Sequence, residues 1–181
     1  NPRACHETEL EYLPAARKKQ VAVVGAGPGG LAGATVAAGR GHEVTLFEGA
    51  AEIGGQFVMA SRVPGKEEFR ETLRYFRRQL EVTGVRVQLG VRATAEALAG
   101  GGFDEVVVAT GVVPRDPGLP GQDHPKVLSY VDVLLHGAAV GPKVAVVGAG
   151  GIGFDVAGFL VHALPPPGEA LAHWLAEWGV A

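Results

Sequence analysis

Cysteine is scarce in this sequence, and its scarcity excludes two kinds of structure. Cys5 is the single cysteine among 181 residues, so no intramolecular disulfide and no four-cysteine metal cluster can be built from this chain. No apolar run approaches the roughly 20 residues that a membrane-spanning helix needs, and no secretory signal pattern opens the chain. The formal net charge of −3 gives no reason to expect nucleic acid or an anionic membrane as partner. A reducing, cytoplasmic setting fits these absences best.

Glycine, in contrast, is abundant, with 28 residues, and part of it lies in a repeated motif. The heptapeptide VAVVGAG occurs at Val21–Gly27 and again at Val144–Gly150, and each copy opens a complete G-x-G-x-x-G fingerprint. One fingerprint is a weak signal, but two, each after a β-branched strand and before an apolar helix, predict two dinucleotide sites in series. That arrangement is typical of a flavoprotein that takes electrons from a nicotinamide nucleotide. The fingerprint glycines are Gly25, Gly27, Gly30, Gly148, Gly150 and Gly153.

The hydrophobic pattern predicts an α/β fold, with a Rossmann-like unit on a parallel sheet and then the truncated start of a second such unit. The polar segment 1–19 has no periodicity and is expected to be a connector. Strands are expected at Val21–Val24, Glu43–Glu48, Val85–Val91 (half-buried) and Phe103–Ala109 (buried), with a further strand from Lys143. Helices are expected at Leu31–Arg40, at Lys66–Val82, after Gly153 and near Glu169–Trp178.

The first fingerprint predicts a diphosphate site with a carboxylate beside it. Gly25 permits the tight turn, Gly27 lets the backbone approach a pyrophosphate, and Gly30 lets the helix pack against the strand. Pro28 suits the first helical turn, where an N–H has no intrahelical partner. Glu48, at the end of the second strand, is placed to accept hydrogen bonds from ribose hydroxyls. Because that charge would repel a 2′-phosphate, the site should take FAD or NAD rather than NADP.

FAD is favoured over NAD because a longer ligand needs further loops, and the sequence offers them. Gly54 and Gly55 form a glycine pair where backbone can pass close to the ligand, although a tight-turn role alone also explains them. Gly111 follows a strand at the side of the sheet where doubly wound folds bind ligands. Lys66 is either a cation for the phosphates or flavin or a solvated lysine. Asp155 is either a surface carboxylate or a group close to the meeting point of nicotinamide and flavin.

Beyond the glycines, segments along nearly the whole chain closely resemble bacterial NADPH-dependent 2,4-dienoyl-CoA reductase. The resembling segments are Asn1–Glu7, Ile53–Phe57, Pro64–Phe69, Glu71–Tyr75, Glu81–Val85, His124–Tyr130, Gly150–Asp155 and Glu177–Gly179. The resemblance implies a three-part parent protein: a TIM barrel with FMN and the dienoyl-CoA site, a four-iron cluster, and FAD and NADPH domains. Electrons would then pass from NADPH to FAD, the cluster, FMN and finally the substrate, in fatty acid β-oxidation.

The same resemblance assigns parts and residues to this chain. It implies a connector at 1–19, an incomplete FAD-binding domain at 20–140 and the beginning of an NAD(P)H-binding domain at 141–181, with the TIM barrel as an upstream partner. It implies flavin contacts at Gly29, Glu48, Gln56, Lys66 and Ala93, and places Cys5 beside the cluster rather than on it. No catalytic residue and no metal ligand are expected in this chain, which we expect to have little activity and to retain flavin weakly by itself.

Two alternatives remain open from the sequence. A related enoate reductase or NADH-dependent ene-reductase shares the domain order, so the barrel alone would decide between them. A nucleotide-binding structural module without a redox role, holding ADP or FAD, would also use these glycines.

Overall fold

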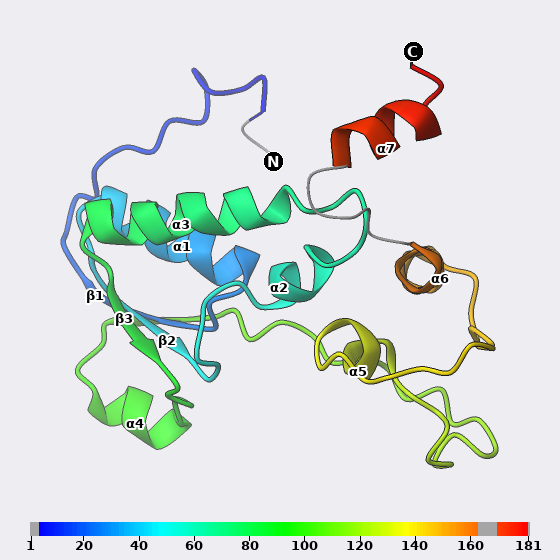
Figure 1. Ribbon diagram of the computed structural model, residues 1–181. Helices are drawn as coiled ribbons and strands as arrows, with labels where there is room; N and C mark the ends of the chain where they lie inside the picture. The colour runs from blue at the N-terminus through cyan, green and yellow to red at the C-terminus, as the bar shows by residue number, and fades with distance from the viewer. Residues whose placement is uncertain (1–3, 163–169, 181) are drawn as a thin grey trace.

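The computed structural model describes residues 4–162 and 170–180, and its centre is a four-stranded parallel sheet (Figure 1). The strands lie in the order β3-β2-β1-β4 and every pairing is parallel. This confirms the predicted α/β class with a parallel sheet, and the bounds of the second strand agree with the expected ones. The strands are β1 (Gln20–Val24), β2 (Glu43–Glu48), β3 (Arg86–Leu89) and β4 (Glu105–Val108).

Two helices lie side by side over one face of this sheet (Figure 1). Helix α1 (Pro28–Gly39) has small residues along its length and a proline at its start, so it can lie close to the strands. Helix α3 (Phe69–Thr83) is amphipathic and ends at Gly84, which adopts the left-handed conformation that favours glycine. The two helices and the strands bury one common core that includes Val21, Val23, Leu31, Ala34, Leu46, Leu73 and Leu80.

A second, smaller apolar cluster lies away from the sheet. It forms where α2 (Gln56–Ala60), α5 (Tyr130–Leu134) and α6 (Gly151–Val161) meet, and its buried members are Val63, Leu134 and Val156. The start of α5 is fixed by a capping box, in which the Ser129 hydroxyl accepts from the Asp132 N–H and the Asp132 carboxylate accepts from the Ser129 N–H. The remaining helices are α4 (Ala95–Gly100) and α7 (Ala170–Glu177).

The helix bounds differ from the expected ones by a few residues. Helix α1 begins three residues before Leu31, because Pro28 is accommodated in its first turn. Helix α3 begins three residues after Lys66. The last helix agrees with the expected one except at its ends, and Glu169, like residues 1–3 of the connector, lies outside the described residues. Within residues 4–162 and 170–180, no helix is both long and apolar enough to cross a membrane.

Burial of the two edge strands is a correction to the sequence prediction. All four residues of β4, expected to be buried, are exposed, and the side chain of Val108 is exposed to 73%. All four residues of β3, expected to be half-buried, are exposed as well, although Val85 just before it is buried. Both strands lie at an edge of the sheet and have a neighbour on one side only, so their apolar side chains are less covered than those of β1 and β2.

The strand expected from Lys143 is also corrected. Residues 143–147 form no strand in the described structure, and Val147 is exposed to 82%. A parallel strand needs a neighbour to hydrogen-bond with, and none of the four strands of the sheet pairs with this segment. The glycine turn and the helix that follow it are nevertheless formed.

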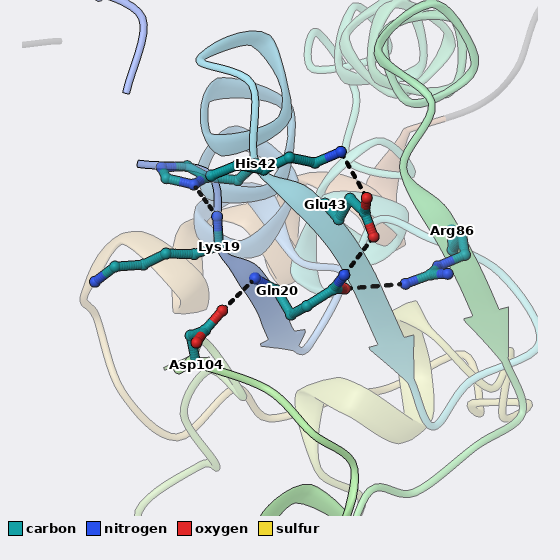
Figure 2. A network of polar contacts seen from close by, with 7 residues as sticks. Lys19, Gln20, His42, Glu43, Arg86 and Asp104 are labelled. Carbon is teal, nitrogen blue, oxygen red and sulfur yellow. Dashed lines mark hydrogen bonds and ion pairs between the residues drawn. The ribbon is translucent and has the colours of Figure 1, made fainter. Parts of the chain in front are cut away.

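A network of polar side chains ties together the amino-terminal ends of all four strands (Figure 2). Gln20, the first residue of β1, is its centre. Its N–H donates to the Asp104 carboxylate over 2.7 Å, its amide nitrogen donates to Glu43, and its amide oxygen accepts from Arg86 over 3.4 Å. Nearby, the Lys19 N–H donates to Nδ1 of His42. This edge is opposite to the one at which the first glycine turn leaves β1.

The charge of Glu43 is expected to make stability depend on pH. Hydrogen bonds from Lys18 and Gln20 lower the pKa of Glu43 below its ordinary value of 4.5. A lowered pKa in the folded state adds stability above the unfolded-state pKa, and this stability is lost as the pH falls through the folded-state pKa. We therefore expect Glu43→Gln to lower the free energy of unfolding at neutral pH and to make no difference well below pH 4.5, as measured by urea denaturation.

The control is Glu71→Gln, which removes an exposed ion pair with Arg74 inside one helix and should change stability little at either pH. A Glu43→Gln effect that stays constant from neutral to acid pH would contradict the prediction.

Candidate functional site

The first glycine turn is shaped by two contacts that leave no room for a side chain. Gly25 follows β1 with φ at +104°, and a Cβ there would lie 2.3 Å from the carbonyl oxygen of Ala109. A Cβ on Gly30 would lie 1.8 Å from the carbonyl oxygen of Gly25. The start of α1 therefore touches the end of β1 directly, as the fingerprint requires.

The outer side of this turn fits a diphosphate. Gly27 is the N-cap of α1, so no side chain caps the start of this helix. Pro28 follows it as the first helical residue. Amides in the first turn of a helix have no carbonyl partner within the helix, and the helix dipole favours negative charge there. A Cβ on Gly27 or Gly29 would meet nothing within 4 Å, so there is open space beside this helix start. Backbone donors facing open space are the usual cradle for phosphate.

Glu48 lies at the mouth of this turn, as the sequence predicts. Its Oε2 accepts from the Ala26 N–H over 2.6 Å and its Oε1 accepts from the Ala50 N–H over 2.8 Å. The carboxylate is thus held beside the phosphate cradle by two backbone donors. Because each carboxylate oxygen has a further lone pair, the group can also accept hydrogen bonds from sugar hydroxyls.

The loop with Gly54 and Gly55 lies against the first turn. The Gly54 N–H donates to the carbonyl oxygen of Ala26 over 2.8 Å, and a Cβ on Gly55 would lie 3.0 Å from the Cα of Gly27. Gln56, which is exposed, then begins α2. Sequence reasoning missed Ala26, whose N–H and C=O join Glu48 and Gly54 to the turn. Its place between two fingerprint glycines is the only sequence signal for that role.

Two further predicted residues lie at the same carboxyl edge of the sheet. The Val91 N–H donates to the carbonyl oxygen of Glu48 over 2.9 Å and brings the segment with Ala93, which is half-buried, to the end of β2. The Ala109 N–H donates to the carbonyl oxygen of Val24 over 2.8 Å, so Gly111 follows β4 beside the end of β1. Parallel α/β sheets bind ligands at this edge.

The second fingerprint repeats the geometry of the first. Gly148 has φ at +117°, and a Cβ on Gly153 would lie 2.1 Å from the carbonyl oxygen of Gly148. Gly150 is an extended N-cap without a side-chain capping bond, and its carbonyl oxygen accepts from the Phe154 N–H over 3.1 Å. The corresponding bond in the first turn, from the Leu31 N–H to Gly27, is 2.9 Å long. The second turn therefore also presents a helix start that no side chain caps.

The structure also brings Lys66 and Asp155 together, a pairing that the sequence does not predict. The Lys66 ammonium lies 2.6 Å from Oδ2 of Asp155, and both side chains are partly exposed. Lys66 is thus tied to the helix of the second fingerprint, and its predicted contact with flavin stays a prediction.

A groove of 480 Å³ runs between α3 and β3, lined by apolar residues such as Ile53, Leu80 and Val87 and by the charged Glu52 and Arg77. None of the predicted nucleotide-binding residues lines it. We therefore do not assign it to the nucleotide site.

Two glycine turns of similar geometry in one chain, the first with a carboxylate at its mouth, are typical of oxidoreductases that use two nucleotides. Comparison with known families agrees with this class. The sequence profile of the family described as pyridine nucleotide-disulphide oxidoreductase matches residues 19–164, and the chain belongs to this family. Membership implies binding of flavin and NAD(P)H.

Two similar proteins of known function and a similar solved structure are reductases. The chain is 36% identical over 161 residues to a metal reductase of Desulforamulus reducens and 38% identical over 157 residues to a cinnamate reductase of Clostridium sporogenes, each match covering 87% of the chain. It is similar to the structure of 2-naphthoyl-CoA reductase in complex with 2-naphthoyl-CoA, with a TM-score of 0.83 and 36% identity over 88% of the chain. The chain spans about a quarter of these proteins, 24%, 23% and 24% respectively. It is an oxidoreductase module of the kind found in such flavoenzymes.

The close contact at Gly30 predicts a strong and position-specific effect of a methyl group. Gly30→Ala would push its Cβ into a backbone oxygen, so we expect the free energy of unfolding to fall by about 1–3 kcal/mol, as for overpacked cores. Gly33→Ala lies in the same helix, where a Cβ meets nothing within 4 Å, and should stabilise by about 0.5–1 kcal/mol. Urea denaturation of the two variants tests this, and equal effects at both positions would contradict it.

The position of Glu48 predicts a loss of nucleotide affinity when its carboxylate is removed. We expect Glu48→Ala to weaken binding of ADP or FAD by about 1–3 kcal/mol, because charge-assisted hydrogen bonds are lost. Titration calorimetry at a temperature where circular dichroism shows folded protein gives the measurement. The control is Glu52→Ala, a carboxylate on the loop that follows β2, which pairs with Arg77 over 3.7 Å and should leave the affinity unchanged. Unchanged affinity for Glu48→Ala would remove this residue from the site.

Proposed function

We propose that this chain is the FAD- and NADPH-binding electron-input module of an iron–sulfur flavoenzyme that reduces 2,4-dienoyl-CoA. The observation that carries this proposal is the repeated glycine turn, because two phosphate cradles of one geometry suit two nucleotides that exchange electrons. In the parent protein an upstream TIM barrel with FMN and a four-iron cluster would receive those electrons.

Within this proposal residues 20–140 bind FAD and residues 141–181 begin the NAD(P)H-binding part, with the connector 1–19 leading to the barrel. The carboxylate of Glu48 supports FAD at the first turn, since it can accept from ribose hydroxyls and repels a 2′-phosphate. The loop at Gly55 supports it further, because a second piece of backbone lies against the turn where a longer ligand would continue. Bound flavin would accept a hydride from reduced nicotinamide.

The chain's own residues would act by binding and orientation. The amides at the start of α1 would hold the diphosphate of FAD, and those at the start of α6 would hold that of the nicotinamide nucleotide. Glu48 would orient the adenosine ribose. Gln56, Lys66 and Ala93 are the further FAD contacts in this proposal, and Gly111 would line the flavin side of the sheet.

An acyl-CoA substrate is supported by two observations. Segments along nearly the whole chain resemble 2,4-dienoyl-CoA reductase, and the similar solved structure is a reductase in complex with an aromatic acyl-CoA. A second candidate is an ene-reductase for unsaturated acids without CoA, which the 38% identity to cinnamate reductase favours.

The substrate proposal is tested on the full-length protein that contains this chain. We expect it to oxidise NADPH rapidly when 2,4-dienoyl-CoA is added and slowly with cinnamate, as followed by nicotinamide absorbance. Faster oxidation with cinnamate would favour the second candidate. A rate of NADPH oxidation that neither compound changes would contradict a role in reducing either one.

The redox role itself is tested by denaturing that protein and identifying the nucleotides released. We expect stoichiometric FAD in addition to FMN. Release of ADP in place of FAD would contradict the proposal and favour the structural alternative.

A further inference from the structure

One ion pair joins the segment between α2 and α3 to the helix that follows the second glycine turn. Lys66 Nζ and Asp155 Oδ2 are 2.6 Å apart, although the two residues are 89 positions apart in the sequence. Their side chains are exposed to 41% and 30%, so the pair is half-shielded from water. Within residues 4–162, it is the one ion pair that reaches α6 from another element.

Each partner is attached firmly to its own side. Asp155 lies in α6, one turn beyond the N-cap Gly150, so it moves with the second phosphate cradle. On the other side, the Lys66 N–H donates to the carbonyl oxygen of Val63 over 3.0 Å, and the Val63 N–H donates to that of Ala60 over 3.1 Å. These hydrogen bonds link Lys66 to the end of α2. The first residue of α2, Gln56, follows the loop that contacts the first cradle.

A small apolar seam lies beside the ion pair. Val63, Leu134 and Val156 are buried there, and the Arg62 guanidinium donates to the carbonyl oxygens of Leu134 and Leu135 over 2.9 and 2.7 Å. Because residues 143–147 pair with none of the four strands, no sheet contact fixes the second turn. The seam and the ion pair hold it in place.

These two contacts have different physical characters. The seam packs α6 against α5 and against the segment after α2 through buried apolar side chains, and burial of apolar surface is non-directional. A hydrogen-bonded ion pair fixes the direction between two atoms, and it connects α6 to a segment of the first unit. A partly exposed pair adds little net stability, so its main effect here is on orientation.

We propose that Lys66 and Asp155 form a clamp between the two nucleotide-binding turns and that this clamp sets how the second turn faces the first. The inference rests on the proposed function, because orientation matters only if electrons pass between two nucleotides. Lys66 and Asp155 are then positioning residues for that transfer. A small displacement of two reacting groups lowers a rate far more than it lowers affinity.

The clamp is tested first by hydrogen exchange on the chain without nucleotide. We expect Asp155→Asn to speed exchange of the α6 amides by about two- to fivefold, the amount that a weak ion pair contributes. The charge-swapped double variant, Lys66→Asp with Asp155→Lys, should restore slow exchange. The control is Lys19→Met, which breaks a pair of equal length, 2.6 Å to Glu105, at the opposite edge of the sheet and should leave α6 unchanged.

The second test uses stopped-flow reduction of FAD by NADPH in the full-length protein. We expect Asp155→Asn to lower the limiting rate of flavin reduction by about ten- to a hundredfold, as for misplaced reactants, while the concentration of NADPH at half-maximal rate changes less than threefold. Asp155→Glu, which keeps a carboxylate opposite Lys66, should retain most of the rate.

The outcomes separate the clamp from the function. Exchange and reduction that are both unaffected by Asp155→Asn would overturn the clamp. Faster exchange with an unchanged reduction rate would overturn its role in orienting the nucleotides. If NADPH does not reduce the flavin of the parent protein, the proposed function is refuted. The exchange result would still decide whether the ion pair fixes α6.

Discussion

The nucleotide-binding edge of this protein depends on one close contact, between the start of α1 and the end of β1. Gly30 approaches the carbonyl oxygen of Gly25 so closely that a Cβ would lie 1.8 Å from it. This approach aims the first-turn amides at the carboxyl edge of the sheet and leaves the Ala26 amide within reach of Glu48. The second turn repeats the approach at Gly153 without a paired strand before it, so this geometry is a local property of the glycine motif.

Local features of this kind could be predicted from the sequence. Strand β2 has its expected bounds, and both turns form where the glycines predict them. Both depend on residues adjacent in the chain: alternation and β-branching for a strand, absence of a side chain for a turn. The exposure of Val108 could not be predicted in the same way, because burial of a strand depends on what lies next to it in the sheet. An apolar run such as that of β4 is equally compatible with a central strand and with an edge strand.

Contacts between residues that are far apart in the sequence could not be predicted either. From the sequence, Lys66 and Asp155 are each ambiguous, because a charged residue near a helix start is compatible with a ligand contact and with solvation. Only their distance in space shows that they bind each other. The bonds from Ala26 to Glu48 and Gly54 are similar, since a backbone amide leaves no trace in the residue type that bears it.

The two edges of the sheet are held by different chemistry, and this difference bears on how the site can be specific. At the amino-terminal edge, side chains around Gln20 tie the four strands together. At the glycine turns of the carboxyl edge the donors are backbone amides, which every residue except proline carries. Choice between nucleotides must therefore come from the few side chains that border the cradles. At the first cradle that side chain is Glu48, which two backbone N–H groups hold in place, and we propose that its charge accepts a sugar hydroxyl and repels a further phosphate.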